Sequence, residues 1–161
     1  MRRYIKFYMN LLGIKYKRIP IKKYPVGANL CTTIALSKAL KKTFDSTFEL
    51  QVEYGKRSHA IINSARYVVE PILKDNGYER FRDFKPLKST VGEFMYNHKT
   101  GSYVICTKNH IEWYSEGCRY IVVEDRVTTV DLDSWLFHPL LFVYIKKKGK
   151  EDNVKEEKEL S

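Results

Sequence analysis

A histidine and a carboxylate that could act together lie in the strand-rich stretch 101–125. Short β-prone runs separated by turn residues predict strands at 103–107, 110–115 and 118–123. Counting outward from the turn at 116–117 places His110 near Val123, Glu124 or Asp125. Because opposite residues of antiparallel strands lie roughly 4.5–5.5 Å apart, a carboxylate there would orient the imidazole, as catalysis by histidine requires. Such pairs also occur without a catalytic role, so the pattern needs a nucleophile.

Cys31 is the candidate nucleophile, and it lies at the start of the first strongly predicted helix. Apolar residues recur at helical spacing over 30–43, and Asn29 is a favourable N-cap. Cys31 would then be the second residue of the helix, where unpaired N–H groups and the helix dipole stabilise a thiolate. On the helix alone, packing of Cys31 against apolar neighbours is the favoured explanation.

The other predicted elements place these residues in an α+β fold. The stretch 45–54 is expected to connect helices, with at most a short strand. An apolar stripe predicts a helix over 56–75, which Pro71 should kink or split. A capping-box pattern at 90–93 begins a short helix, and the apolar run 140–145 predicts a last buried strand. We therefore expect N-terminal helices packed on a small antiparallel sheet.

The composition indicates a globular protein, because 43% of the 161 residues are hydrophobic and 14% are aromatic. We expect one domain over 1–145, beginning with a basic and aromatic segment over 1–26, and a disordered charged tail over 146–161. The formal net charge of +10 admits an acidic protein or a nucleic acid as partner. A basic surface that only keeps the protein in solution is the simpler explanation, since no nucleic-acid-binding motif accompanies the charge.

Membrane insertion, secretion and metal binding are not indicated. No apolar run is long enough to span a bilayer, and 1–12 lacks the pattern of a secretory signal, so we expect a cytoplasmic protein. The three cysteines are an odd number without a Cys-x-x-Cys pair, which predicts neither a disulfide framework nor a zinc knuckle. A zinc site made of Cys31, His110 and Asp125 would lack a fourth ligand, so we expect no metal and no cofactor.

The order of the candidate residues resembles that of the papain-like cysteine peptidase superfamily, in its compact phage and bacterial members. The sequence Gly-Ala-Asn-Leu-Cys that ends at Cys31 looks like the start of the nucleophile helix. The sequence Gly-Ser-Tyr-Val-Ile-Cys-Thr before His110, and the glycine turn that leads to Asp125, look like the strands of the histidine and the acid. The resemblance extends over about 27–133.

The resemblance implies a role for each candidate residue. Cys31 would be the thiolate nucleophile and His110 the base that activates it. Asp125 would orient His110, with Glu124 as the alternative if a β-bulge shifts the strand by one residue. Members of the superfamily usually carry a glutamine shortly before the cysteine as an oxyanion donor. This chain has none there, and Asn29 is the candidate replacement.

Two functions from different classes follow. In the first, the protein is a small thiol hydrolase that cleaves peptide or isopeptide bonds through an acyl-enzyme on Cys31. In the second, it is a catalytically silent binding module of the same fold, for example a phage protein that engages a host protein or nucleic acid through its basic surface. The Cys–His–Asp order favours the first, and the charge of +10 favours the second.

Overall fold

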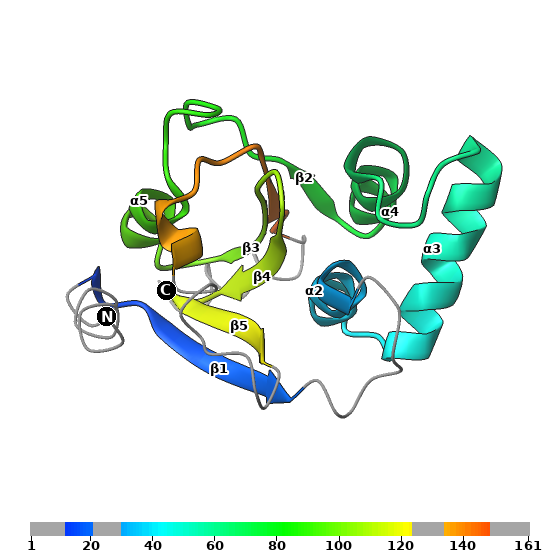
Figure 1. Cartoon of the computed structure of the whole chain (residues 1–161), viewed down its shortest axis with the longest axis horizontal. Coiled ribbons are helices and arrows are strands. Elements are labelled where there is room, and N and C mark those ends of the chain that lie inside the picture. Colours follow the sequence, from blue (N-terminus) through cyan, green and yellow to red (C-terminus); the bar gives the residue numbers. More distant parts are fainter. Residues whose placement is uncertain (1–11, 21–29, 124–133, 149–161) are drawn as a thin grey trace, which may run out of the picture.

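The chain folds around a six-stranded mixed sheet with helices on both sides (Figure 1). The structure is a computed structural model, and it describes residues 12–20, 30–123 and 134–148. The strands are β1 (Lys15–Pro20), β2 (Tyr78–Arg80), β3 (Ser102–Cys106), β4 (Ile111–Ser115), β5 (Cys118–Val123) and β6 (Phe142–Lys146). The helices are α2 (Leu30–Leu40), α3 (Phe44–Ser58), α4 (Glu70–Asp75) and α5 (Val91–Asn97), with a π-helical turn η2 (Ala65–Val69) and a 3-10 turn η3 (Trp135–Phe137).

The predicted α+β class and the three consecutive strands are confirmed. The strands run in the order β1-β5-β4-β3-β6-β2, and β3, β4 and β5 form a meander joined by tight turns. Ser115 pairs with Cys118 across the second turn, where Glu116 and Gly117 both have positive φ. The expectation of a purely antiparallel sheet is wrong at β1, which runs parallel to β5. Parallel pairing requires a long connection between the two strands, and the intervening helices provide it.

Successive side chains of each strand point to opposite faces of the sheet, so the core has two layers. Tyr103 and Ile105 of β3 face α5 and η3, together with Tyr114 of β4. Val104 and Cys106 of the same strand face the other side, where α2, η2 and α4 pack on the sheet. Figure 1 shows these two groups of helices on opposite sides of the central strands. The sheet therefore holds α2, and the cysteine at its start, against β3 and β4.

The helical region 44–75 differs from the prediction in two places. The expected connection over 45–54 is part of helix α3, which Thr43 caps through a hydrogen bond from Ser46 N–H. The buried face of α3 carries Thr47, Gln51 and Gly55 at a spacing of four residues. These residues are polar or small, so a search for apolar periodicity does not detect the helix.

The predicted helix over 56–75 is divided well before Pro71. Helix α3 ends at His59, which has a left-handed backbone conformation (φ 52°) that closes the helix. A loop and the turn η2 follow, η2 continues directly into α4, and Pro71 is the second residue of α4. The interruption of the helix therefore falls at 59–64, and these residues form a loop between α3 and η2.

The remaining predicted elements are present. The capping box of α5 is confirmed, since Thr90 accepts from Glu93 N–H and Glu93 accepts from Thr90 N–H. The apolar run 140–145 forms most of β6, which continues to Lys146, and Lys147 N–H donates to the Gly77 carbonyl. The rest of the predicted tail, from 149, lies outside the described residues, as does most of the segment 1–26. Within the described ranges, no helix combines the length and apolar character needed to cross a bilayer.

Candidate functional site

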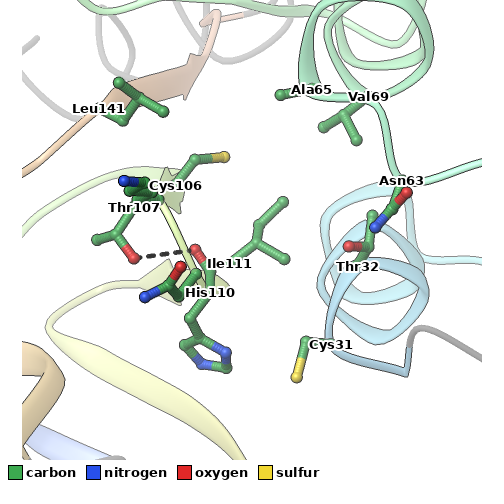
Figure 2. Close-up of a pocket in the computed structure, with 12 residues that line it drawn as sticks. Cys31, Thr32, Asn63, Ala65, Val69, Cys106, Thr107, His110, Ile111 and Leu141 are labelled. Carbon is green, nitrogen blue, oxygen red and sulfur yellow. Dashed lines mark hydrogen bonds between the residues drawn. The ribbon is translucent and has the colours of Figure 1, made fainter. Parts of the chain in front are cut away.

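Cys31 and His110 line one pocket, although 78 residues of chain separate them. Cys31 lies in the first turn of α2, and His110 lies at the end of the β3–β4 turn, directly before Ile111. Figure 2 shows the Cys31 thiol and the His110 ring on facing sides of the pocket. The pocket has a volume of about 360 Å³ and Cys31 is partly exposed in it. Two residues from distant parts of the sequence therefore line the same pocket.

His110 contacts a buried ion pair formed by Glu112 and Arg119. His110 Nε2 lies 3.2 Å from Oε1 of Glu112, two residues further along β4. The Glu112 carboxylate also accepts from Arg119 of β5, at 2.7 Å from Nη2 and 3.0 Å from Nε. The side chains of Glu112 and Arg119 are 2% and 0% exposed. This bidentate contact fixes the carboxylate, and the carboxylate in turn fixes the imidazole.

These contacts favour the charged form of His110. Burial alone lowers the pKa of His110, but the nearby Cys31 thiol and the hydrogen bond and charge of Glu112 outweigh it and raise the pKa to about 9. Burial raises the pKa of Glu112, but the Arg119 charge and the contact with His110 prevail and hold it below its ordinary value. Since Nε2 faces Glu112, the ring nitrogen left for the Cys31 thiol is Nδ1.

The turn that carries His110 is fixed by a tryptophan. Thr107 N–H donates to the His110 carbonyl at 2.9 Å, and the Thr107 hydroxyl accepts from Trp135 Nε1 at 2.7 Å. The Trp135 ring meets the imidazole edge-on, with centroids 4.8 Å apart, and the Arg119 guanidinium lies 5.6 Å from the Trp135 ring centroid. The backbone and the ring of His110 are thus both held, which limits the orientations open to the imidazole.

The opposite wall of the pocket is the loop between α3 and η2. Gln51 of α3 is buried, accepts from the Thr33 hydroxyl at 2.7 Å and donates to the Ile62 carbonyl at 3.0 Å. These hydrogen bonds tie the loop to α2, two residues after Cys31. It places Asn63 at the pocket, next to Thr32 (Figure 2).

Sequence reasoning identified part of this arrangement and missed part of it. Cys31 and His110 are brought together, whereas the predicted Asn29, Glu124 and Asp125 lie outside the described residues. Glu112 was missed. The signal was available, because residues i and i+2 of an extended segment lie on the same face, so an acid two positions after His110 can reach its ring. Counting across the turn directed attention to the next strand instead.

The described residues contain no cluster of three or more His, Cys, Asp or Glu side chains that could hold a metal ion. Of the two other cysteines, Cys118 is on β5, whereas Cys106 lines the same pocket as Cys31, and burial raises the pKa of Cys106 to about 12. Comparison of the chain with protein family models, with curated proteins and with solved structures found no match. The site's own geometry therefore carries the functional argument.

Proposed function

We propose that this protein is a small thiol hydrolase, similar to papain-like enzymes, which cleaves peptide or isopeptide bonds through an acyl-enzyme on Cys31. The observation that carries the proposal is that Cys31 and His110 line one pocket and that the buried Glu112 contacts His110. A thiol beside an imidazole that a carboxylate orients is the arrangement that nucleophilic catalysis by cysteine requires. Asp125 and Glu124 remain candidates for the orienting role, and Glu112 joins them.

Each step uses a group with a defined place. In the reactive pair the proton of the Cys31 thiol already resides on His110 Nδ1, in line with the charged form that Glu112 favours, and the thiolate attacks the carbonyl carbon of the scissile bond. When the C–N bond breaks, His110 gives that proton to the departing amine, and a thioester remains on Cys31. Water then attacks the thioester with His110 as base, which releases a carboxylic acid and restores the thiol. Glu112 stabilises the imidazolium in both steps, and the N–H groups of the first turn of α2 are available as oxyanion donors.

The test compares the reactivity of Cys31 with that of its variants. We expect alkylation of Cys31 by iodoacetamide to persist well below pH 7 and to decrease at least tenfold in His110→Ala, with Cys118 as internal reference. Incubation with peptide esters or amides should add the acyl mass to Cys31, and Cys31→Ser should not accumulate this adduct. Ordinary Cys31 reactivity that does not change in His110→Ala would refute the proposal.

A second candidate function rests on the exposed basic edge of the sheet. Strand β1 forms the edge beside β5, and its Lys15, Lys17 and Arg18 side chains are exposed. With a net charge of +10, this edge is the described surface best suited to an acidic protein or a nucleic acid. Edge lysines also prevent strand-to-strand aggregation, so the charge has a simpler explanation as well. Binding to a duplex oligonucleotide that weakens steeply between 50 and 200 mM salt would support this function.

A further inference from the structure

The pocket at Cys31 combines an apolar floor with polar groups around it. The aliphatic side chains of Ala65, Val69, Ile111 and Leu141 form the floor (Figure 2). Lys108 and Asn109 come from the β3–β4 turn, and Asn63 comes from the loop on the opposite wall. A volume of about 360 Å³ is in the range of sites that hold a small ligand or one side chain.

Three polar side chains of the pocket have no partner among the described residues, and one of them is positively charged. Within the described part of the chain, the side chains of Lys108, Asn63 and Asn109 have no hydrogen-bond or ion-pair partner. Among the described residues that line the pocket none is acidic, and Lys108 is the positive charge that remains unpaired there, since His110 is paired with Glu112. Amide N–H groups and an ammonium are donors suited to a carboxylate. The pocket is therefore complementary to a ligand with an aliphatic stem and an anionic end.

We propose that this pocket binds the acidic side chain of a substrate residue next to the scissile bond, with glutamate preferred over aspartate. Lys108 would pair with the carboxylate, Asn63 and Asn109 would donate to its oxygens, and the aliphatic floor would contact the methylene groups. This specificity rests on the proposed function, because it takes Cys31 as the point of attack. The longer glutamate stem covers more of the apolar floor than aspartate does, which favours it.

The first test measures the charge preference at Cys31 without any hydrolysis. Iodoacetate and iodoacetamide alkylate the same thiol but differ in charge, so the ratio of their rates reports the affinity of the pocket for a carboxylate. The rates are read at Cys31 by mass spectrometry of the peptide that contains it. We expect Lys108→Gln to lower the iodoacetate-to-iodoacetamide ratio by about two- to fivefold, and 0.5 M salt to remove most of that difference.

Lys42→Gln is the matched control, because it makes the same change in net charge. Lys42 is exposed and follows the far end of α2, on the order of 15 Å from Cys31 by the rise of the helix. The ratio should remain within about 1.5-fold of the unchanged protein in this variant. An equal decrease in both variants would overturn the proposal, since the effect would then come from net charge. Absence of reaction at Cys31 with either reagent would also overturn it, because the pocket would be closed to a small carboxylate.

The second test uses matched fluorogenic peptides that carry Glu, Asp or Gln next to the scissile bond. We expect kcat/KM to be highest for Glu, and Lys108→Gln to reduce the Glu-to-Gln preference at least threefold, in line with the loss of one charge pair. Cleavage of all three peptides with equal kcat/KM would overturn the proposed specificity but not the proposed hydrolase function. If no peptide is cleaved but the alkylation ratio still depends on Lys108, the hydrolase function is refuted and the carboxylate-binding site stands.

Discussion

Replacement of Glu112 by glutamine tests whether a buried carboxylate holds His110 in its charged form. Glutamine keeps the size of the side chain and removes its charge, 3.2 Å from His110 Nε2. An opposite charge at this range shifts a pKa by about 1–3, so we expect the pKa of His110 to fall from about 9 to about 6–8. The pH dependence of Cys31 alkylation should change in the same variant, since the imidazolium partner of the thiolate becomes less stable.

The same substitution leaves Arg119 without its charge partner in the core. Glu112 and Arg119 are both buried, and removal of one member of a buried pair costs about 3–5 kcal/mol of unfolding free energy. The double variant Glu112→Gln/Arg119→Met removes the uncompensated charge and should recover part of that loss. Urea unfolding of the single and double variants therefore separates two losses of unfolding free energy. One comes from the unpaired buried charge of Arg119, and the other comes from the lost contact with His110.

Stability should also depend on pH through His110. The pKa of His110 in the folded protein is about 9, above the ordinary value near 6.5. Its contribution to stability is therefore fully present below about pH 6.5 and is lost as pH rises through about 9. A difference of that size corresponds to about 3 kcal/mol, which should appear as a lower urea midpoint at pH 9.5 than at pH 6. The pH dependence should be weaker in Glu112→Gln.

An NMR titration of ¹³C-labelled histidine measures the pKa directly. The chain has four histidines, and the spectrum of His110→Ala assigns the signal of His110. A folded Glu112→Gln variant in which the pKa of His110 is within about 0.5 of the unchanged protein would refute the role given to Glu112. The orienting carboxylate would then have to be sought at Asp125 or Glu124.

Three further predictions concern the scaffold of the site. Gly55→Ala should lower the unfolding free energy by about 1–3 kcal/mol, because a Cβ there would lie 2.8 Å from the Ala60 carbonyl oxygen. This loss should exceed the gain from the better helix propensity of alanine. A rise in the thermal unfolding midpoint would contradict the prediction. Thr90→Ala should cost about 1 kcal/mol in urea unfolding, because it removes the acceptor for Glu93 N–H, whereas Thr90→Ser should cost little. Burial raises the pKa of Cys106 to about 12, so Cys106 should not be alkylated at pH 8 until the protein unfolds. If Cys106 were alkylated in the native protein as fast as Cys118, the core would have to open.

The sequence predicts the elements whose local patterns are consistent with their final environment. The β3–β4–β5 meander has β-branched and aromatic runs between turn residues, and α5 has a complete capping box. Helix α3 was missed, because the side chains that it buries, Thr47 and Gln51, are polar. Gln51 is stable there because its partners come from α2 and from the Ile62 carbonyl. Those partners are remote in sequence or lie in a loop, and a periodicity search does not include them.

For the candidate site, the sequence by itself determined the chemical groups, and the tertiary structure decided how they are combined. A cysteine at a helix start and a histidine at a strand start are local features, so Cys31 and His110 could be identified from their neighbours in sequence. Whether they face each other depends on how α2 packs on β3 and β4, through apolar contacts that no local pattern specifies. The choice of Glu112 as the carboxylate at His110 depends on the burial of Arg119 on the adjacent strand. A charge becomes stable in the core only when its partner is placed beside it, and that placement is a property of the whole fold.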